Sequence, residues 1–247
     1  MLAAAIRIIK MKNQATLRPE SSTASEPSAY ADAVSSRASA VTQRPRVEGK
    51  FLFAGNEKLW VKGVTYGTFR PDKDGLQFPE PAQVAQDFEQ MAGNGINALR
   101  TYTVPPRWLL DIALENGLHV MVGIPWEQHI AFLGDRARVR SIEERTRAAA
   151  RACVDHPALL CYAVGNEIPA SIVRWHGRRR IEKFIERLYR VVKQEDPGAL
   201  VTYVNFPTTE YLQLPFLDFV CFNVYLESQQ GLEAYLARLQ NLVDERP

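Results

Sequence analysis

The chain has 247 residues, of which 46% are hydrophobic, 10% aromatic and 23% charged. This composition is typical of a globular protein, and it excludes collagen-like, coiled-coil and fully disordered chains. Thirty Lys and Arg residues against 28 Asp and Glu residues give a formal net charge of +2, so the sequence lacks the strong basic surplus that indicates a nucleic-acid partner.

The first 45 residues have the composition of a disordered segment. Residues 21–40 contain 13 Ser or Ala and one aromatic, Tyr30. Such a segment cannot bury enough apolar surface to offset the entropy that it would lose on ordering. The opening residues MLAAAIRIIKMK are too short and too interrupted by charge for a secretory signal. We therefore expect a disordered leader over 1–45 and a folded domain over 46–247.

The folded part begins with a predicted β-hairpin. Two short apolar runs flank the sequence Ala54-Gly55-Asn56-Glu57. A glycine–asparagine pair between two such runs is typical of a tight hairpin turn.

Strands and helices then alternate along the chain. Short apolar runs predict strands, and apolar residues at spacings of three and four, such as Val84, Phe88 and Met91, predict helices. Glycine and asparagine mark several helix ends, and prolines mark helix starts. The six predicted strands are 61–66, 96–101, 118–124, 158–164, 199–205 and 217–225. The predicted helices are 81–93, 105–116, 142–155, 176–195 and 232–243, with a short helical turn at 209–213.

This alternation predicts an α/β fold with parallel strands, as either a TIM (β/α)8-type barrel or a doubly wound open sheet. No GxGxxG or GxxxxGK[ST] sequence follows a strand, which removes the main argument for a nucleotide-binding open sheet. Polar and aromatic residues instead follow nearly every strand. In a barrel all of these strand ends meet at one face, where active sites lie, so the distribution favours an incomplete barrel of about six β/α units. The strand-end residues are Tyr66, Arg100, Tyr102, Trp126, His129, Asn166, Glu167, Asn205, Asn223 and Tyr225.

The clearest chemical signal is the sequence CYAVGNEIP, residues 161–169. An apolar strand runs into Gly165, and Pro169 ends regular pairing shortly afterwards. Glu167 is thereby held at the carboxyl end of the strand, where a glutamic acid can donate a proton. Asn166 beside it can bind a substrate hydroxyl. Spacing alone also leaves open that the pair only caps a loop.

Several segments resemble the retaining glycoside hydrolases of clan A, and most closely the barrel domain of glycoside hydrolase family 2. The segment HPALLCYAVGNE, 156–167, resembles the fourth strand of that family with its Asn-Glu motif. KGVTYG, 62–67, resembles the first strand and GINALRTY, 95–102, the second. FVCFNVY, 219–225, resembles the sixth. The resemblance covers about residues 50–247.

The resemblance implies hydrolysis or transglycosylation of a β-linked poly- or oligosaccharide by double displacement. Glu167 would be the acid/base, and Asn166 would hold the 2-hydroxyl of the sugar. Arg100 would keep the nucleophile ionised, because a nearby cation favours the charged form of a carboxyl group. Tyr225 would orient the nucleophile. Position alone nominates the other substrate-binding or supporting residues, which are Trp126, Tyr66, Asn205, Asn223 and His129.

The nucleophile of that family is a glutamate that ends the seventh strand. The sequence predicts six strands before Asp-Glu-Arg-Pro, 244–247, so we expect this chain to lack the nucleophile and to be inactive by itself. Glu127, Glu210 and Glu227 follow other strands, but a solvated loop is the default interpretation of each. The alternative is a non-catalytic carbohydrate-binding or pseudoenzyme barrel, or an inactive fragment.

No feature of the sequence calls for a cofactor or a metal. The three cysteines, Cys153, Cys161 and Cys221, have no metal-ligand spacing, and the four histidines form no HxxxH pattern. No apolar stretch reaches the 18 residues of a transmembrane helix. We expect a cytoplasmic protein with a carbohydrate substrate and no nucleic-acid partner. Resemblance to barrels attached to glycosyltransferase modules suggests a possible association with such a module.

Overall fold

The computed structural model describes residues 43–242 and 246–247. All but the last three residues of the predicted leader, 1–45, lie outside these described residues. The final residue of the helix predicted at 232–243 lies outside them as well.

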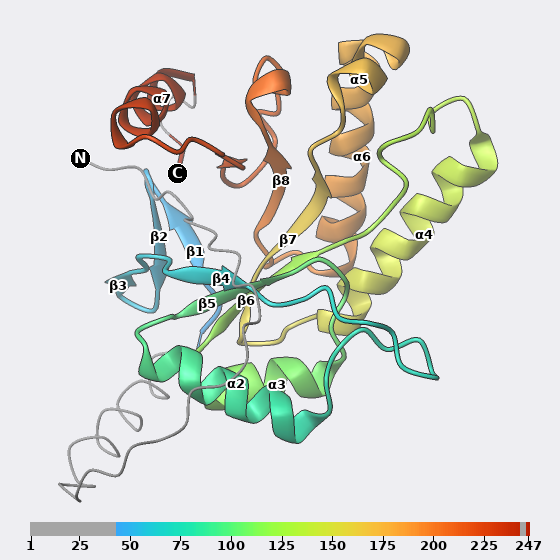
Figure 1. The fold of residues 1–247 in the computed structure, drawn as a ribbon. Helices are drawn as coiled ribbons and strands as arrows, with labels where there is room; N and C mark the ends of the chain where they lie inside the picture. The colour runs from blue at the N-terminus through green and yellow to red at the C-terminus, as the bar shows by residue number, and fades with distance from the viewer. Residues whose placement is uncertain (1–42, 243–245) are drawn as a thin grey trace, which may run out of the picture.

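The centre of the fold is a curved sheet of six parallel strands, shown in Figure 1. The strands follow one another in sequence order across the sheet, so each pairs with its neighbour in the chain. This order is that of a β/α barrel and not of a doubly wound sheet, whose strand order reverses at a switch point. The strands are β4 (Gly63–Thr65), β5 (Ala98–Thr101), β6 (His119–Gly123), β7 (Leu159–Asn166), β8 (Val201–Asn205) and β9 (Cys221–Phe222).

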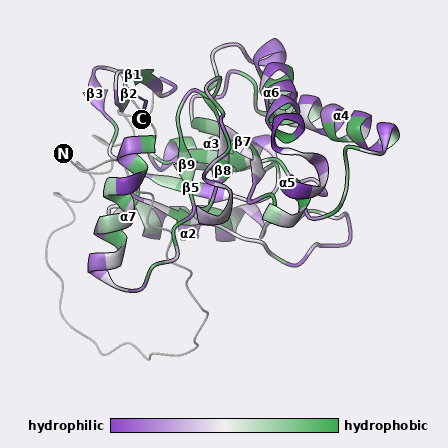
Figure 2. Ribbon diagram, turned by 90° about the horizontal axis from the view of Figure 1, so that it is seen from above, coloured by the Kyte–Doolittle hydropathy of each residue, from purple (hydrophilic) through white to green (hydrophobic). Residues whose placement is uncertain are grey.

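Helices connect these strands, as the alternating pattern predicts. The connection from β8 to β9 differs from the others, because it contains only the 3-10 turn η1 (Pro207–Thr209). The helices are α2 (Pro81–Gly93), α3 (Arg107–Glu115), α4 (Arg136–Cys153), α5 (Ala170–His176), α6 (Arg178–Glu195) and α7 (Gln229–Leu242). Figure 2 shows hydrophilic and hydrophobic residues alternating in bands along α4, α6 and α7.

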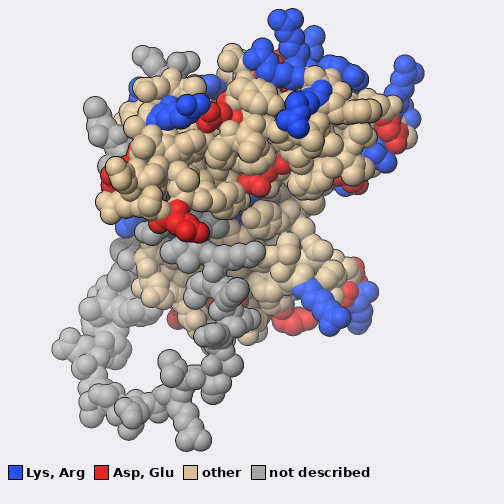
Figure 3. Space-filling view, turned by 45° about the horizontal axis from the view of Figure 1, so that its top comes forward, with Lys and Arg blue, Asp and Glu red and all other residues tan. Residues whose placement is uncertain are grey.

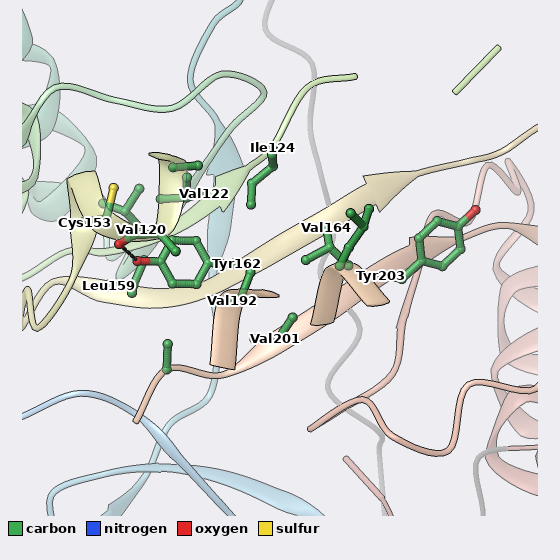
Figure 4. Packing of buried hydrophobic residues seen from close by; sticks show 14 of the residues in the cluster. Val120, Val122, Ile124, Cys153, Leu159, Tyr162, Val164, Val192, Val201 and Tyr203 are labelled. Carbon is green, nitrogen blue, oxygen red and sulfur yellow. Dashed lines mark hydrogen bonds between the residues drawn. The ribbon is translucent and has the colours of Figure 1, made fainter. Parts of the chain in front are cut away.

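Helices α2, α3, α4 and α6 pack on the outer face of the sheet. Successive strand residues point to opposite faces, so every second residue of β5, β6 and β7 faces the helices. Figure 4 shows part of this outer core around Tyr162, whose hydroxyl donates to the carbonyl oxygen of Ala150 at 3.0 Å. The outer core includes Leu99, Val120, Val122, Tyr162, Val164, Val201 and Tyr203 from the strands, with Phe88, Leu110 and Ile185 from the helices.

The inner face of the sheet has its own, smaller core. A three-stranded antiparallel sheet, β1 (Arg46–Glu48), β2 (Phe51–Ala54) and β3 (Glu57–Lys58), contributes to it. The predicted turn at Gly55-Asn56 is confirmed, since Ala54 pairs with Glu57 across it. A second turn joins β1 to β2 and is an element that the sequence analysis did not predict. Leu52 of β2 is buried in the inner core with Ala98, Met121, Leu160, Cys161, Ala163, Leu200, Val204, Phe219 and Cys221.

Two helical segments differ from the sequence prediction. Helix α4 begins at Arg136, six residues before the predicted start, because the Asp135 side chain accepts hydrogen bonds from the backbone N–H groups of Ala137 and Arg138. The short helix α5 was not predicted. Gly177, with φ of +86°, separates α5 from α6, and the left-handed backbone there favours glycine. Among the described residues, no helix is long and apolar enough to cross a membrane.

Candidate active site

Arg100, on β5, is the cation of a polar cluster on the inner face of the sheet. It lies two residues from Ala98, which belongs to the inner core, and is only 4% exposed. Its guanidinium donates to Oδ1 of Asn166 at 2.7 Å and to Oδ1 of Asn223 at 3.3 Å. The guanidinium also lies over the ring of Tyr102, with 4.7 Å to the ring centroid. Arg100 Nε is buried and has no hydrogen-bond partner among the described residues, so it is free to donate to a group that enters the site.

Asn166 and Glu167 are neighbours in the chain, yet their side chains meet in this cluster. In a regular strand they would point to opposite faces. The register between β7 and β8 shifts between Ala163 and Asn166, which indicates a bulge with one extra residue in β7. Glu167 itself has φ of +51°, an uncommon conformation for a residue with a side chain. The bulge and this left-handed residue together bring both side chains to the inner face.

Gly165 lies in a crowded position where β7 bulges. A Cβ atom at this position would lie 3.2 Å from ring atoms of both Trp126 and Tyr203. These rings pack in the outer core, so a larger residue would have to displace them by a few tenths of an ångström. The glycine in the Gly-Asn-Glu sequence therefore has a packing role that places the two polar residues after it.

Asn223 and Tyr225, which follow the last strand of the sheet, hold the Glu167 carboxylate. Asn223 Nδ2 donates to Oε1 of Glu167 at 2.7 Å and lies 3.0 Å from Oδ1 of Asn166. The Tyr225 hydroxyl donates to the same Oε1 at 2.8 Å. Partial burial of that hydroxyl and its bond to Glu167 raise the pKa of Tyr225 to about 12, although the residue as a whole is 72% exposed. Oε2 of Glu167 receives no hydrogen bond from the described residues and is available for proton transfer.

Three residues to which the sequence analysis gave no catalytic or substrate-binding role support the cluster. Oε1 of Gln128 accepts a hydrogen bond from the backbone N–H of Asn166 at 2.8 Å. The hydroxyl of Tyr203 accepts from the backbone N–H of Ile168 at 2.8 Å, which fixes the chain directly after Glu167. Tyr102 lies under Arg100, as described above. A strand-end position was the available signal for Tyr102, but no sequence signal distinguishes Gln128 from other loop residues.

The other sequence-nominated residues lie elsewhere. The hydroxyl of Tyr66 donates to Asp87 of α2 at 2.7 Å, and burial together with this bond raises its pKa. Trp126 packs in the outer core, where its indole N–H donates to the carbonyl of Val164 at 2.9 Å. Asn205 caps the turn after β8 through Thr209. His129 is exposed in the loop before α4.

Glu127 and Glu210, weighed as substitute nucleophiles, have other partners. Glu127 lies 2.5 Å from Arg145, and that hydrogen bond lowers the pKa of the Glu127 carboxyl. Glu210 binds Arg238 and accepts from the hydroxyl of Tyr235 at 3.1 Å. Glu227 is exposed. Within the described part of the chain, the hydrogen-bonded cluster contains a single carboxylate, Glu167. No group of three or more metal-ligating side chains occurs in that same part.

Comparisons with known proteins place this geometry in context. The family described as glycosyl hydrolases family 2, TIM barrel domain, matches residues 46–245. No curated protein matches the chain. Many solved structures do, and those reported below share 20% identity or less with the chain, so they show the likeness of fold alone.

The first of these structures is a β-glucuronidase 2 of Bacteroides uniformis, with 20% identity and a TM-score of 0.66 over 80% of this chain. A β-glucuronidase from Ruminococcus gnavus has 16% identity and a TM-score of 0.67 over 83% of this chain. A β-glucuronidase of Bifidobacterium dentium has 15% identity and a TM-score of 0.66, also over 83%. The match covers 25%, 37% and 34% of these three chains, so this chain spans about a quarter to a third of their length.

Proposed function

The chain belongs to the TIM-barrel domain family of glycosyl hydrolases family 2. We propose that it functions in a retaining glycosidase that acts on β-linked poly- or oligosaccharides, with Glu167 as the acid/base. One observation carries the proposal. Glu167 stands at the end of β7 in a left-handed conformation, with Oε1 held by Asn223 and Tyr225 and Oε2 open. Such strain and positioning are typical of functional residues.

The reaction has two steps. In the first, Glu167 protonates the oxygen of the leaving sugar while a second carboxylate attacks the anomeric carbon and forms a glycosyl–enzyme bond. In the second, the deprotonated Glu167 takes a proton from water or from a sugar hydroxyl, whose oxygen then displaces the enzyme carboxylate. Because the described cluster holds one carboxylate, we assign the attacking group to a residue outside the described ones. In retaining enzymes the two carboxyl groups lie about 5–5.5 Å apart.

The neighbours of Glu167 have distinct roles in this proposal. Oδ1 of Asn166 accepts from Arg100 and from Asn223, so its amide group is left to donate to the 2-hydroxyl of the sugar. The unpartnered Nε of Arg100 suits a carboxylate beside it, and this cation would keep the attacking group ionised. Tyr225 shares its hydroxyl between Glu167 and the attacking group. The exposed rings of Tyr102 and Tyr225 give the sugar an apolar surface.

The single carboxylate of the cluster also favours a second candidate function, a non-catalytic carbohydrate-binding barrel. It would use the same amide and aromatic groups without turnover. Calorimetry that shows sugar binding by the 247-residue chain, together with no cleavage of aryl β-glycosides, would support this second function for the chain by itself. Association with a glycosyltransferase module and a cytoplasmic location remain predictions.

The proposal is tested by replacing Glu167 with Gln in a chain that includes strands seven and eight of the barrel. Gln keeps the shape and accepts the bond from Tyr225, but it cannot transfer a proton. We expect kcat on β-linked oligosaccharides to fall at least about a hundredfold. Glu210→Gln is the control, since Glu210 is bonded to Arg238 and Tyr235, and it should retain turnover. Unchanged turnover in Glu167→Gln would overturn the assignment.

A further inference from the structure

A strongly basic surface lies where α5 meets α6. We call it the basic corner, and it consists of Arg174, Trp175, Arg178, Arg179, Arg180 and Lys183. All six residues are exposed. Figure 3 shows Lys and Arg side chains gathered along the upper edge of the molecule, over the end where α5 and α6 meet.

The cations of the basic corner are mostly unpaired. Of the cations in the basic corner, only Arg178 forms an ion pair with a described residue, Glu182 at 3.5 Å. Glu182 is also the only acidic residue between Ala170 and Lys183 in the sequence. Other arginines of α4 and α6 are paired. Arg187, farther along α6, pairs with Glu143 of α4 at 2.8 Å, and Arg151 of α4 pairs with Glu195 of α6 at 2.7 Å. The corner therefore has an excess of positive charge that the fold itself does not neutralise.

Stability does not account for these cations. Arg178, Arg179 and Arg180 are the first three residues of α6, where the positive end of the helix dipole disfavours cations. Gly177 supplies no side-chain cap, and the first turn of α6 has no acid. The helix end and the guanidinium groups instead add to one positive potential, which suits an anionic ligand.

Trp175 indicates what kind of anion binds. Its side chain is 76% exposed in the middle of these cations, although burial of a tryptophan ring is strongly favourable. A flat aromatic ring can stack on the apolar face of a sugar. The arginines around it can bind carboxylate or sulfate groups on the same polymer with paired hydrogen bonds. A neutral glucan would use the ring but not the cations.

The basic corner follows the candidate active site closely in the chain. Helix α5 begins three residues after Glu167, and its seven residues extend about 10 Å. Nε2 of His176 accepts from the backbone N–H of Phe132 at 3.1 Å, which ties the corner to the loop before α4. An oligosaccharide of several units bound near Glu167 can therefore reach Trp175.

We propose that the basic corner binds an acidic polysaccharide, whose rings carry carboxylate or sulfate groups, and that this polymer is the substrate of the site at Glu167. The inference rests on the proposed glycosidase function and adds the substrate class. Its test measures binding rather than turnover, so the two proposals can fail separately.

The experiment measures the affinity of the full 247-residue chain for polymannuronate, a β-linked polymer with one carboxylate per sugar. The neutral counterpart is the propylene glycol ester of the same polymer. The test variants are Trp175→Ala and the triple variant Arg178→Ala, Arg179→Ala, Arg180→Ala. The charge-matched control replaces Lys62, Arg70 and Lys73 with Ala, since these cations are exposed and lie on a different part of the chain.

We expect polymannuronate to bind, the ester to bind at least about tenfold more weakly, and salt to weaken binding. Each test variant should lose about tenfold in affinity, while the control triple keeps it. Equal losses in the test and control triples would overturn the proposal, as would equal binding of the ester. Binding to vesicles with 30% phosphatidylserine and not to polymannuronate would also overturn it, because the ligand would then be a membrane.

Discussion

At the scale of single residues, the direction of a side chain from its strand decides which strand-end residues form the site. Arg100 and Asn223 lie two residues from Ala98 and Cys221, which face the inner core. Tyr66 and Trp126 lie two residues from positions that face the helices, and both pack in the outer core. All of these candidates lie at strand ends. Because side chains alternate between the two faces along a strand, some of the candidates face the inner side of the sheet and the others face the helices.

The same rule fails at Asn166, because β7 has a bulge there. A strict period of two through Ala163 would place Glu167 on the inner face and Asn166 on the outer one. The extra residue in β7 turns Asn166 inward, and the φ of +51° at Glu167 keeps its side chain in the cluster. Glycine in the sequence allows such a bulge but does not prove one.

His119 provides a prediction at this scale. Burial lowers the pKa of His119 to about 4, and its Nδ1 atom has no partner among the described residues. Because the unfolded chain binds a proton near pH 6.5 and the folded one does not, the free energy of unfolding falls as the pH drops from 6.5 to 4. The loss due to His119 is about 3 kcal/mol.

Denaturant unfolding between pH 4 and pH 7 measures this loss. His119→Leu should remove most of the slope, and His129→Ala should leave it unchanged, because His129 is exposed. A slope that survives in His119→Leu would show that other groups cause it. His176, whose pKa is also lowered by burial, is the first to test in that case.

At the scale of elements, the spacing of apolar residues predicted which side of a helix is buried, but it did not predict where every helix begins. Helix α6 has Ile181, Phe184, Ile185 and Leu188 buried on one side, as its spacing predicts. Helix α4 begins with arginines that alternate with Ala137 and Val139, a spacing that is not the helical one, so the pattern alone started the helix too late. Its start depends on Asp135, whose carboxylate accepts from two backbone N–H groups. These bonds, with that of Arg138 first, lower the pKa of Asp135.

The cap gives a prediction for α4. Asp135→Ala leaves two backbone donors without their partner, so the melting temperature at pH 7 should fall by about 2–4 °C. Asp135→Asn, which keeps an acceptor oxygen, should fall less. The lowered pKa means that the contribution of the carboxylate is present above the ordinary pKa of an aspartate and is lost in acid. An alanine variant as stable as the parent would show that α4 does not need this cap.

At the scale of the whole molecule, contacts between distant segments hold the N-terminal part on the barrel. Arg44 precedes β1, and its guanidinium donates to both carboxylate oxygens of Asp196, at 2.5 and 2.9 Å. It also donates to the carbonyl oxygens of His156 and Cys153. Asp196, which follows α6, is 1% exposed, so its charge depends on this cation.

Arg44→Met tests this dependence. Loss of the cation leaves the Asp196 carboxylate buried with a hydrogen bond from the Tyr162 hydroxyl but no positive charge beside it, so the free energy of unfolding should fall by about 3 kcal/mol. Arg46→Met is the matched control two residues away. Arg46 pairs at the surface with Glu48, so its loss should cost about 0.5 kcal/mol or less. Chemical denaturation of the two variants compares them directly, and equal losses would contradict the prediction.

The sequence by itself determined the parallel β/α architecture and the family, and it predicted a functional role for Gly-Asn-Glu. Hydrophobic periodicity and a short motif are local properties, and they can be read along the chain. Only the tertiary structure decided which strand-end residues meet. Arg100 and Asn223 are 123 positions apart, and Gln128 supports Asn166 from a loop that no local pattern marks. The basic corner also needed the structure, because the sequence shows a run of arginines without showing which of them have an acid within reach.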